Sequence, residues 1–391
     1  MSLSINLPAA EAGHPLQRYS LSGEPLLPPQ NPLPANRIAL SAAHVVADPL
    51  SAAPPGGKAA IDWTRTLEYR RYLLQQGLGI AEAMDTAQRG MGLDWPTALE
   101  LIERTLAETR DIPHAVIFSG CGTDQLPADQ ARNLDDVVRA YGQQRDAIAK
   151  LDGRMILMAS RALARVAKNP FDYRLVYRKV LAEAEHPVIL HWLGDMFDPA
   201  LQGYWGSERF EEALDTCLEV IHENVQKVDG IKISLLDKDK EILMRRRLPA
   251  SVKMYTGDDF NYPELIAGDE HGYSHALLGI FDAIAPAAAH ALAALAQGDM
   301  AGYQRLLEPT LPLARLIFSS PTQYYKTGVV FLAYLNGHQE HFIMLGGHQA
   351  MRPLPYFCEI FRLADRAGLL ADPVLAVTRM KRLLALYGVD G

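Results

Sequence analysis

The chain has 391 residues, of which 49% are apolar and 21% are charged. This is the composition of a globular protein, and the length accommodates one large barrel together with an additional domain. The formal net charge of −8 argues against a protein whose main partner is nucleic acid, because such proteins usually carry a basic face. Three cysteines far apart in the sequence exclude a disulfide scaffold and a cysteine-rich zinc site, and they fit a reducing compartment.

No segment is typical of a membrane-spanning helix or a signal peptide. The most apolar long stretch, residues 280–297, is interrupted by Asp282 and His290, which favours a packed helix. Residues 1–16 lack both a basic region and a continuous apolar run, so we expect a cytoplasmic protein without a membrane partner. Residues 1–35 show no period of 2 or 3.6, and we expect them to form an irregular N-terminal arm.

From residue 36 onward, short apolar runs alternate with longer helix-like segments. Short apolar runs are typical of parallel strands that are covered on both faces. The predicted strands are residues 37–46, 79–85, 114–120, 154–160, 187–193, 229–234, 252–256 and 272–277. The predicted helices are residues 63–76, 94–109, 135–150, 172–185, 207–226, 237–247, 262–267 and 282–297. Eight strand–helix repeats predict an α/β protein of the (β/α)8 TIM-barrel class over residues 36–297.

Local signals support these elements and separate the barrel from the C-terminal part of the chain. Asp62 and Asp94 stand where N-caps are expected, and Gly77 stands at a helix C-terminus. A doubly wound open sheet is the main alternative, but the first strand lacks the glycine-rich turn that such folds usually carry. Residues 298–391 show only helical segments, so we expect a C-terminal helical domain.

The active site of a (β/α)8 barrel lies at the carboxyl ends of the strands, where the eight following loops converge. The predicted strand ends are polar, although they close apolar runs. We expect the substrate-binding residues to be Asp85, Thr86, Ser160, Arg161, Asp195, Ser234, Gly257, Asp258 and His275.

Lys232 is the most informative of the strand residues, because Ile231 and Ile233 flank it. A lysine inside a short apolar strand buries its amine or points it into a cavity, and burial favours the neutral form. A neutral amine is what Schiff-base formation with a carbonyl compound requires. A buried ion pair, or a lysine that extends to water, would explain the position equally well. Lys253 stands at the start of its strand, and we expect it to be structural.

The segments GIKIS and YTGDD resemble the dihydrodipicolinate synthase and N-acetylneuraminate lyase superfamily, which comprises class I aldolases on a TIM barrel. The resemblance continues through PELIAGDEHGYSHALLGIF and into the C-terminal helices, at LARLIFSSPTQYYKTGVVFLAYLNG and MRPLPY. PVILHWL is similar to the fifth strand of the family and IAEAMDTAQ to the second. The resemblance implies that Lys232 is the Schiff-base lysine. It also implies a homodimer or homotetramer.

Three departures from the family pattern bear on the substrate. His191 stands where the family carries a proton-relaying tyrosine, and histidine also moves protons near neutral pH. Asp85 stands first in the pair that binds the keto-acid carboxylate in the family, and an anion there repels a carboxylate. An arginine often found after the fifth strand is missing, and Arg161 offers a different anion contact. These departures argue against standard pyruvate chemistry.

The sequence therefore predicts a Schiff-base-forming class I lyase or aldolase that acts on a small oxygenated carbonyl compound, for which a sugar derivative is one candidate. Lys232 is the expected nucleophile and His191 the expected proton carrier, with no cofactor and no metal ion. One alternative is a metal-dependent sugar isomerase or epimerase that uses Glu82, Asp85 and His191 among its ligands. The other alternative is a non-catalytic relative that binds a small molecule.

Overall fold

We describe a computed structural model that covers residues 3–8, 16–33, 35–54 and 57–389. The chain divides into two compact units. Unit 2 comprises residues 37–43 and 79–278, and unit 1 comprises residues 1–36, 44–78 and 279–391. The expected boundaries of a barrel at 36–297 and a C-terminal domain at 298–391 stay a prediction.

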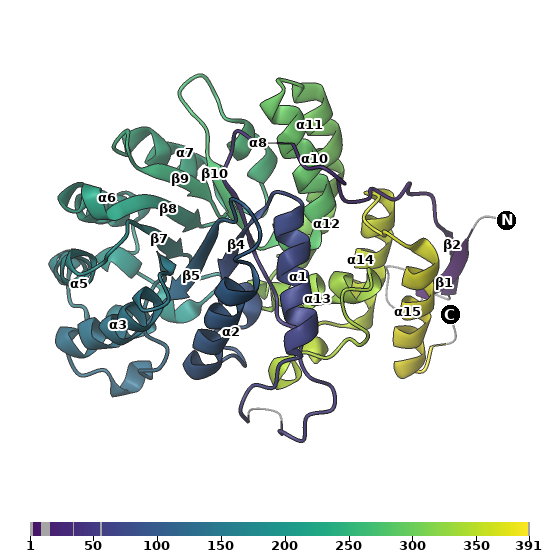
Figure 1. Ribbon diagram of the computed structural model, residues 1–391, viewed down its shortest axis with the longest axis horizontal. Coiled ribbons are helices and arrows are strands. Elements are labelled where there is room, and N and C mark those ends of the chain that lie inside the picture. The colour runs from purple at the N-terminus through teal and green to yellow at the C-terminus, as the bar shows by residue number, and fades with distance from the viewer. Residues whose placement is uncertain (1–2, 9–15, 34, 55–56, 390–391) are drawn as a thin grey trace. The chain divides into compact units, whose positions relative to one another are not determined.

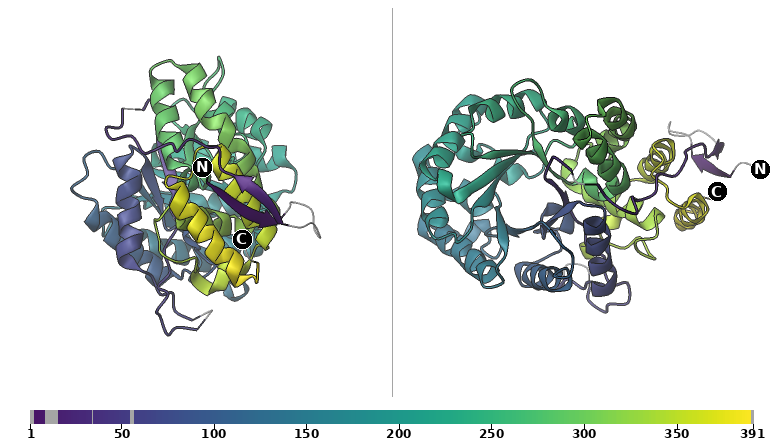
Figure 2. Two further views of the ribbon diagram at one scale, coloured as in Figure 1. Left: turned by 90° about the vertical axis from the view of Figure 1, so that its right-hand side faces the viewer. Right: turned by 45° about the horizontal axis from the view of Figure 1, so that its top comes forward.

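Unit 2 contains a closed barrel of eight parallel strands in the order β10-β3-β4-β5-β6-β7-β8-β9 (Figure 1; Figure 2, right). The strands are β3 (Ala39–Ala42), β4 (Gly79–Glu82), β5 (Ile117–Cys121), β6 (Arg154–Leu157), β7 (Val188–Leu193), β8 (Val228–Ser234), β9 (Lys253–Thr256) and β10 (His275–Leu278). At least one helix follows each strand in the sequence. The predicted (β/α)8 TIM barrel is confirmed, and all eight predicted strands overlap an observed one.

The helices of unit 2 begin and end close to the predicted positions, except for α4, which was not predicted. They are α2 (Trp95–Glu108), α3 (Leu134–Ala149), α4 (Arg161–Val166), α5 (Pro170–Ala182), α6 (Phe210–Glu223), α7 (Lys238–Arg247) and α8 (Tyr262–Ala267). Short 3₁₀ turns lie among them at η1 (Asp85–Ala87), η2 (Ala128–Gln130), η3 (Pro199–Leu201), η4 (Tyr204–Gly206) and η5 (Val225–Lys227). Asp94 caps α2 by accepting a hydrogen bond from the backbone N–H of Thr97, as its position predicts.

Apolar side chains fill the barrel interior. Leu40, Phe118, Ile156, Ile189 and Tyr255 belong to one buried cluster that draws on seven of the strands and the residues directly after them. Because successive side chains of a strand point to opposite faces, the residues two positions further along each strand also point inward. The cluster therefore identifies which residues of each strand point into the barrel, including those near the carboxyl ends of the strands.

Unit 1 contains the N-terminal segment, the helix between β3 and β4, and the described helices that come after β10. Its helices are α1 (Trp63–Gln75), α9 (Ile280–Ala283), α10 (Ala285–Ala296), α11 (Met300–Leu307), α12 (Leu311–Ile317), α13 (Tyr325–Leu335), α14 (Leu354–Arg366) and α15 (Pro373–Leu386). The 3₁₀ turns are η6 (Glu308–Thr310), η7 (Thr322–Tyr324) and η8 (Leu345–Ala350). Asp62 caps α1, and Gly77 adopts the left-handed conformation just after it, as predicted. In the part of the chain that the structure describes, no helix is long and apolar enough to cross a membrane.

The N-terminal arm is not wholly irregular, which corrects the prediction. Strands β1 (Ser4–Pro8) and β2 (Leu16–Ser20) form an antiparallel pair beside α14 and α15 (Figure 1). Ile5 and Leu7 are buried, whereas Asn6 between them is exposed. This period of 2 covers only five residues, which is too short to stand out among the prolines of the segment. The rest of the predicted arm includes residues 9–15, which lie outside the described residues.

Candidate active site

Lys232 points into the carboxyl-terminal half of the barrel. A Cβ atom added at Gly230 would lie 2.6 Å from the ring of Tyr255, so position 230 faces the interior. By the alternation of a strand, Lys232 and Ser234 face the interior too, one and two steps closer to the carboxyl end of β8. The predicted position of Lys232 at the active-site end of its strand therefore agrees with the geometry.

The amine of Lys232 is buried without a partner. The residue is 8% exposed, and among the described residues its amine forms no hydrogen bond and no ion pair. Burial lowers its pKa below the usual value of 10.5, and the charges of Asp85 and Asp259 oppose this shift from a distance. A buried ion pair is therefore not the reason for a lysine in this strand.

Gly257 makes room for the lysine side chain. A Cβ atom at this position would lie 2.7 Å from Cε of Lys232 and 2.2 Å from Oγ of Ser234. Both distances are shorter than carbon–carbon and carbon–oxygen contacts allow. The absence of a side chain at Gly257 lets Lys232 and Ser234 pass close to the backbone, and its role in substrate binding stays a prediction.

We expect Gly257→Ala to reduce turnover by at least about tenfold and to destabilise the fold by about 1–3 kcal/mol, because the added methyl displaces Lys232. Gly142→Ala is the control, since its Cβ atom would meet its nearest neighbour, Arg145, at an ordinary 3.6 Å within α3. This control is expected to leave turnover unchanged and to stabilise the helix by about 0.5–1 kcal/mol. Steady-state kinetics and urea unfolding measure both. Equal turnover of the two variants would contradict this role of Gly257.

His191 lies beside Lys232 on the neighbouring strand. The two residues are direct partners in the register of β7 and β8, which places their side chains next to each other on the same face. Nε2 of His191 lies 3.4 Å from Oγ of Ser234, and Nδ1 has no hydrogen-bond partner among the described residues. Burial, with a contribution from the charge of Lys232, holds the pKa of His191 well below 6.5. The imidazole is therefore neutral at pH 7, and a proton that it accepts is held only weakly.

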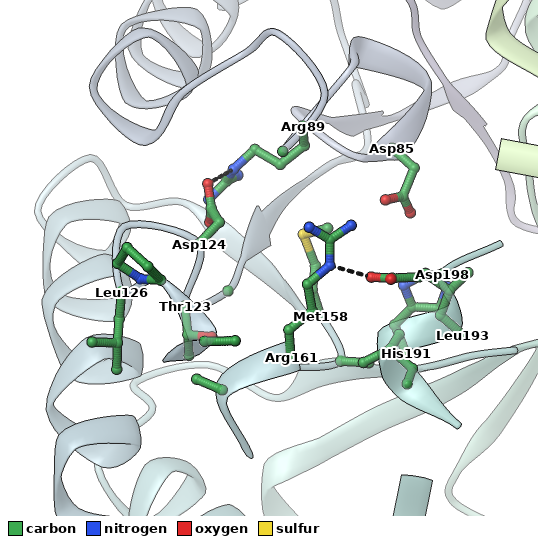
Figure 3. Close-up of a pocket in the computed structure, with 17 residues that line it drawn as sticks. Asp85, Arg89, Thr123, Asp124, Leu126, Met158, Arg161, His191, Leu193 and Asp198 are labelled. Carbon is green, nitrogen blue, oxygen red and sulfur yellow. Dashed lines mark hydrogen bonds and ion pairs between the residues drawn. The ribbon is translucent and has the colours of Figure 1, made fainter. Parts of the chain in front are cut away.

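A cavity of about 200 Å³ opens beside His191 at the loops that follow β4 to β7 (Figure 3). Its charged lining residues are Asp85, Arg89, Asp124, Arg161 and Asp198. Asp85 comes from η1, directly after β4, and Arg161 is the first residue of α4, after β6. The sequence thus predicted two of the charged residues that line the cavity.

Two arginine–aspartate pairs line this cavity (Figure 3). Arg89 donates to both carboxylate oxygens of Asp124, at 2.8 and 2.7 Å. Arg161 donates from Nε to Asp198 at 2.5 Å. Arg89, Asp124 and Asp198 were not predicted, because loop residues carry no periodicity that would mark them.

Thr86 and Ser160 lie near the cavity but do not line it. Thr86 is buried within η1. Ser160 is the N-cap of α4, where its hydroxyl accepts from the N–H of Leu163 at 3.0 Å and pairs with the hydroxyl of Thr123 at 2.6 Å. Its place at the carboxyl end of β6 was predicted, and in the structure it shapes the backbone that carries Arg161.

Two other predicted residues have different surroundings. Asp195 lines a neighbouring cavity of about 230 Å³, and not the cavity beside His191. Asp258 holds its own loop, since its carboxylate accepts from the N–H groups of Phe260 and Asn261 at 2.8 and 3.1 Å. Both residues follow the carboxyl ends of strands, as predicted. Neither of them lines the cavity beside His191.

His275 corrects the prediction, because it lies at the amino end of the barrel. It is the first residue of β10 and accepts a hydrogen bond from the N–H of Ile38 at 3.0 Å. Burial and the charges of Lys253 and Arg37 lower its pKa to about 4. Strand β10 begins three residues later than the predicted strand, so its first residue was mistaken for one near its end.

The described residues contain no group of three or more His, Cys, Asp or Glu side chains placed to hold a metal ion.

These features define a TIM-barrel protein with a partnerless lysine next to a neutral histidine. Solved structures share this fold. A putative dihydrodipicolinate synthetase from Pseudomonas aeruginosa is 16% identical with a TM-score of 0.63, covering 84% of this chain and 99% of that one. YagE, a dihydrodipicolinic acid synthase family protein from E. coli K12 solved with pyruvate, is 12% identical with a TM-score of 0.66, covering 85% and 99%. The predicted resemblance to this superfamily is confirmed at the level of the fold.

The family itself is shown by the sequence. A family model described as "Protein of unknown function (DUF993)" matches residues 5–389, so the chain belongs to this family. A comparison with curated proteins finds no match.

Proposed function

We propose that this protein is a class I lyase or aldolase that forms a Schiff base between Lys232 and a small oxygenated carbonyl compound. The observation that carries the proposal is the buried Lys232 amine, which has no ion-pair partner in the described part of the chain and a lowered pKa. Retaining an uncompensated amine in an apolar strand costs stability, so a chemical role accounts for its presence better than a structural one.

The expected chemistry begins with attack of the neutral Nζ of Lys232 on the substrate carbonyl carbon. A proton then moves by way of His191 from the attacking nitrogen to the carbonyl oxygen, which gives the neutral carbinolamine. A second proton, taken up by His191 from solvent, is transferred to the carbinolamine hydroxyl and makes it a leaving water molecule. Loss of water leaves an iminium ion. The iminium accepts the electron pair of a C–C or C–H bond on the neighbouring carbon as that bond breaks, which gives an enamine. The proton of the C–H bond, or of the hydroxyl on the fragment that leaves as a carbonyl compound, passes to His191. Reprotonation of the enamine and hydrolysis release the product and restore the amine.

His191 suits the proton-transfer step because it lies directly beside Lys232 and is neutral at pH 7. The hydroxyl of Ser234, 3.4 Å from Nε2, extends the path for a proton. Asp85 lines the cavity as an anion, which disfavours a substrate with a carboxylate next to its carbonyl. Among the structural relatives, the YagE structure and that of a dihydrodipicolinate synthase from Acinetobacter baumannii were solved with pyruvate. We propose that this chain acts on a different carbonyl compound.

Reduction with borohydride tests the proposal directly. The protein is incubated with hydroxyaldehydes and hydroxyketones that it turns over, then reduced and digested. We expect the mass of the reduced substrate on the peptide that contains Lys232, and activity that resists a chelator. An adduct confined to other lysines, or none with a substrate that is turned over, would disprove the mechanism. Activity that is lost with a chelator and restored by a divalent ion would favour the metal-dependent alternative.

A further inference from the structure

The cavity beside His191 contains two guanidinium groups that differ in what they can still bind. A guanidinium has five N–H donors in a fixed fork. Arg89 uses all five: Nε and Nη2 donate to Asp124, Nη2 also donates to Gln144, and Nη1 donates to the carbonyl oxygens of Ala83 and Gly120. Its side chain is 2% exposed, and its charge is already matched by Asp124. Arg89 therefore has no donor left for a ligand.

Arg161 presents the opposite case. Its contact with Asp198 uses Nε, on the side of the fork. Among the described residues nothing accepts a hydrogen bond from Nη1 or Nη2, and the side chain is 51% exposed. Figure 3 shows these two nitrogens pointing into the open cavity, toward Asp85. The paired end nitrogens of an arginine match the two oxygens of a carboxylate or a phosphate.

The contact with Asp198 orients this free end. A long exposed arginine loses side-chain entropy when it binds a ligand, and a fixed Nε contact reduces that loss. Asp198 is itself held near η3, where its carboxylate accepts from the N–H of Ala200 at 3.1 Å. The pair is therefore arranged so that Arg161 meets an anion with its free edge.

The place of Arg161 relative to the reacting lysine restricts which anion fits. Arg161 follows β6, whereas Lys232 lies on β8, with β7 between them. The backbones of β6 and β8 are about 10 Å apart, which is two strand spacings. The amine of Lys232 attacks the carbonyl carbon, so a carboxylate bonded directly to that carbon would lie close to Lys232. Arg161 lines the cavity beside His191 and Lys232 does not, so the free edge of Arg161 serves an anionic group several bonds away from the carbonyl carbon.

From these contacts we infer that the substrate carries a carboxylate or phosphate distal to its carbonyl, bound end-on by Arg161, with hydroxyl groups facing Asp85. This inference rests on the proposed function for the position of the carbonyl. Arg161 is then the residue that selects substrates by the anionic group distal to the carbonyl. Asp85 forms no ion pair among the described residues and faces Arg161 across the cavity, so it suits donors rather than a second anion.

Binding of compounds without a carbonyl tests this inference independently of Schiff-base chemistry. Isothermal titration compares 4-hydroxybutyrate with 1,4-butanediol, and glycerol 3-phosphate with glycerol. We expect the anionic member of at least one pair to bind the full-length protein about 10- to 100-fold more tightly, the range for hydrogen bonds to a charged group. The pair that shows the preference identifies the anion as carboxylate or phosphate.

The variants decide whether Arg161 is responsible. Arg161→Gln is expected to abolish the preference, and Arg161→Lys to retain only part of it, because a lysine keeps the charge without the fork. Arg165→Gln is the matched control, since Arg165 lies exposed on the same helix and does not line the cavity. Absence of any preference in the unaltered protein, or a preference that survives Arg161→Gln, would overturn the inference.

Borohydride trapping of glyceraldehyde and glyceraldehyde 3-phosphate separates this inference from the proposed function. Binding that depends on Arg161 without an adduct on Lys232 would leave the anion site standing and disprove the Schiff base. If Lys232 forms an adduct with equal efficiency for both probes and binding is equal within each titrated pair, the Schiff base stands and the anion site is disproved.

Discussion

Lys232→Met is expected to lower turnover by at least about 10³-fold and to prevent reductive trapping, while the protein stays folded. Removal of a nucleophile leaves only the contribution of binding and of the remaining polar groups. Methionine keeps the length and the apolar stem of lysine, so the packing against Gly257 persists. The free energy of unfolding is expected to rise by about 1 kcal/mol or more at pH 7, because the cost of burying the amine is gone.

Lys253→Met is the control for this change. Lys253 lies on the neighbouring strand β9, but its amine forms an ion pair with Asp229 at 2.9 Å and is partly exposed. The control should keep turnover within a few-fold of the unaltered protein. Kinetics, mass spectrometry of the trapped peptide and chemical unfolding give the three measurements. Turnover by Lys232→Met close to that of the control would refute a role for the amine in the reaction.

The lowered pKa of Lys232 also predicts how stability and rate depend on pH. Between the pKa of the folded state and the usual 10.5, the unfolded state binds more protons at this site than the folded state does. Stability therefore gains from this group as the pH rises through that window, and Lys232→Met should lack the gain. Turnover should rise in the same direction, because only the neutral amine attacks.

His191→Gln is expected to lower kcat by about 10²- to 10⁴-fold while Lys232 still forms a trapped adduct, only more slowly. Glutamine retains polar atoms near Ser234 but cannot carry a proton between the amine and the substrate oxygen. Because the pKa of His191 lies well below 6.5, its protonation should cause no loss of activity between pH 7 and 6.5. Stopped-flow trapping separates the rate of adduct formation from later steps.

His186→Gln serves as the matched control. His186 lies at a loop position, close to Asp152 at 3.3 Å, and is partly exposed. The change should alter kcat by less than about twofold, because surface substitutions of this kind have small effects. If His191→Gln leaves kcat unchanged as well, another group carries the proton and the assignment of His191 is wrong.

Much of the barrel can be predicted from sequence because parallel strands and amphipathic helices alternate with different periods. The strand that carries Lys232 was predicted to within one residue, since Ile231 and Ile233 mark it as apolar. The segment that precedes the barrel was predicted less well. The burial of Ile5 and Leu7 depends on helices that lie far along the sequence, and no local pattern reports such a partner.

In the candidate site, too, residues within strands were predictable and residues in loops were not. Lys232, His191 and Ser234 were predictable because they stand at fixed offsets within apolar strands. The cavity residue Asp198 comes from a loop, where position in sequence does not determine which cavity a side chain enters. Asp195, three residues earlier in that loop, lines a different cavity for this reason. The full use of donors by Arg89 is visible only from its contacts in the folded chain.

The hydrogen bond from Tyr19 to Asp365 joins residues that are 346 positions apart, and the N–H of Leu26 likewise donates to the carbonyl of Gly368. At a synthesis rate of about 5–20 residues per second, Asp365 leaves the ribosome roughly 20 to 70 s after Tyr19. During that interval the apolar face of Ile5 and Leu7 has no helix to cover it. Ile5 and Leu7 are thus synthesised long before the helices that cover them, and their apolar side chains are open to chaperones and proteases during that interval.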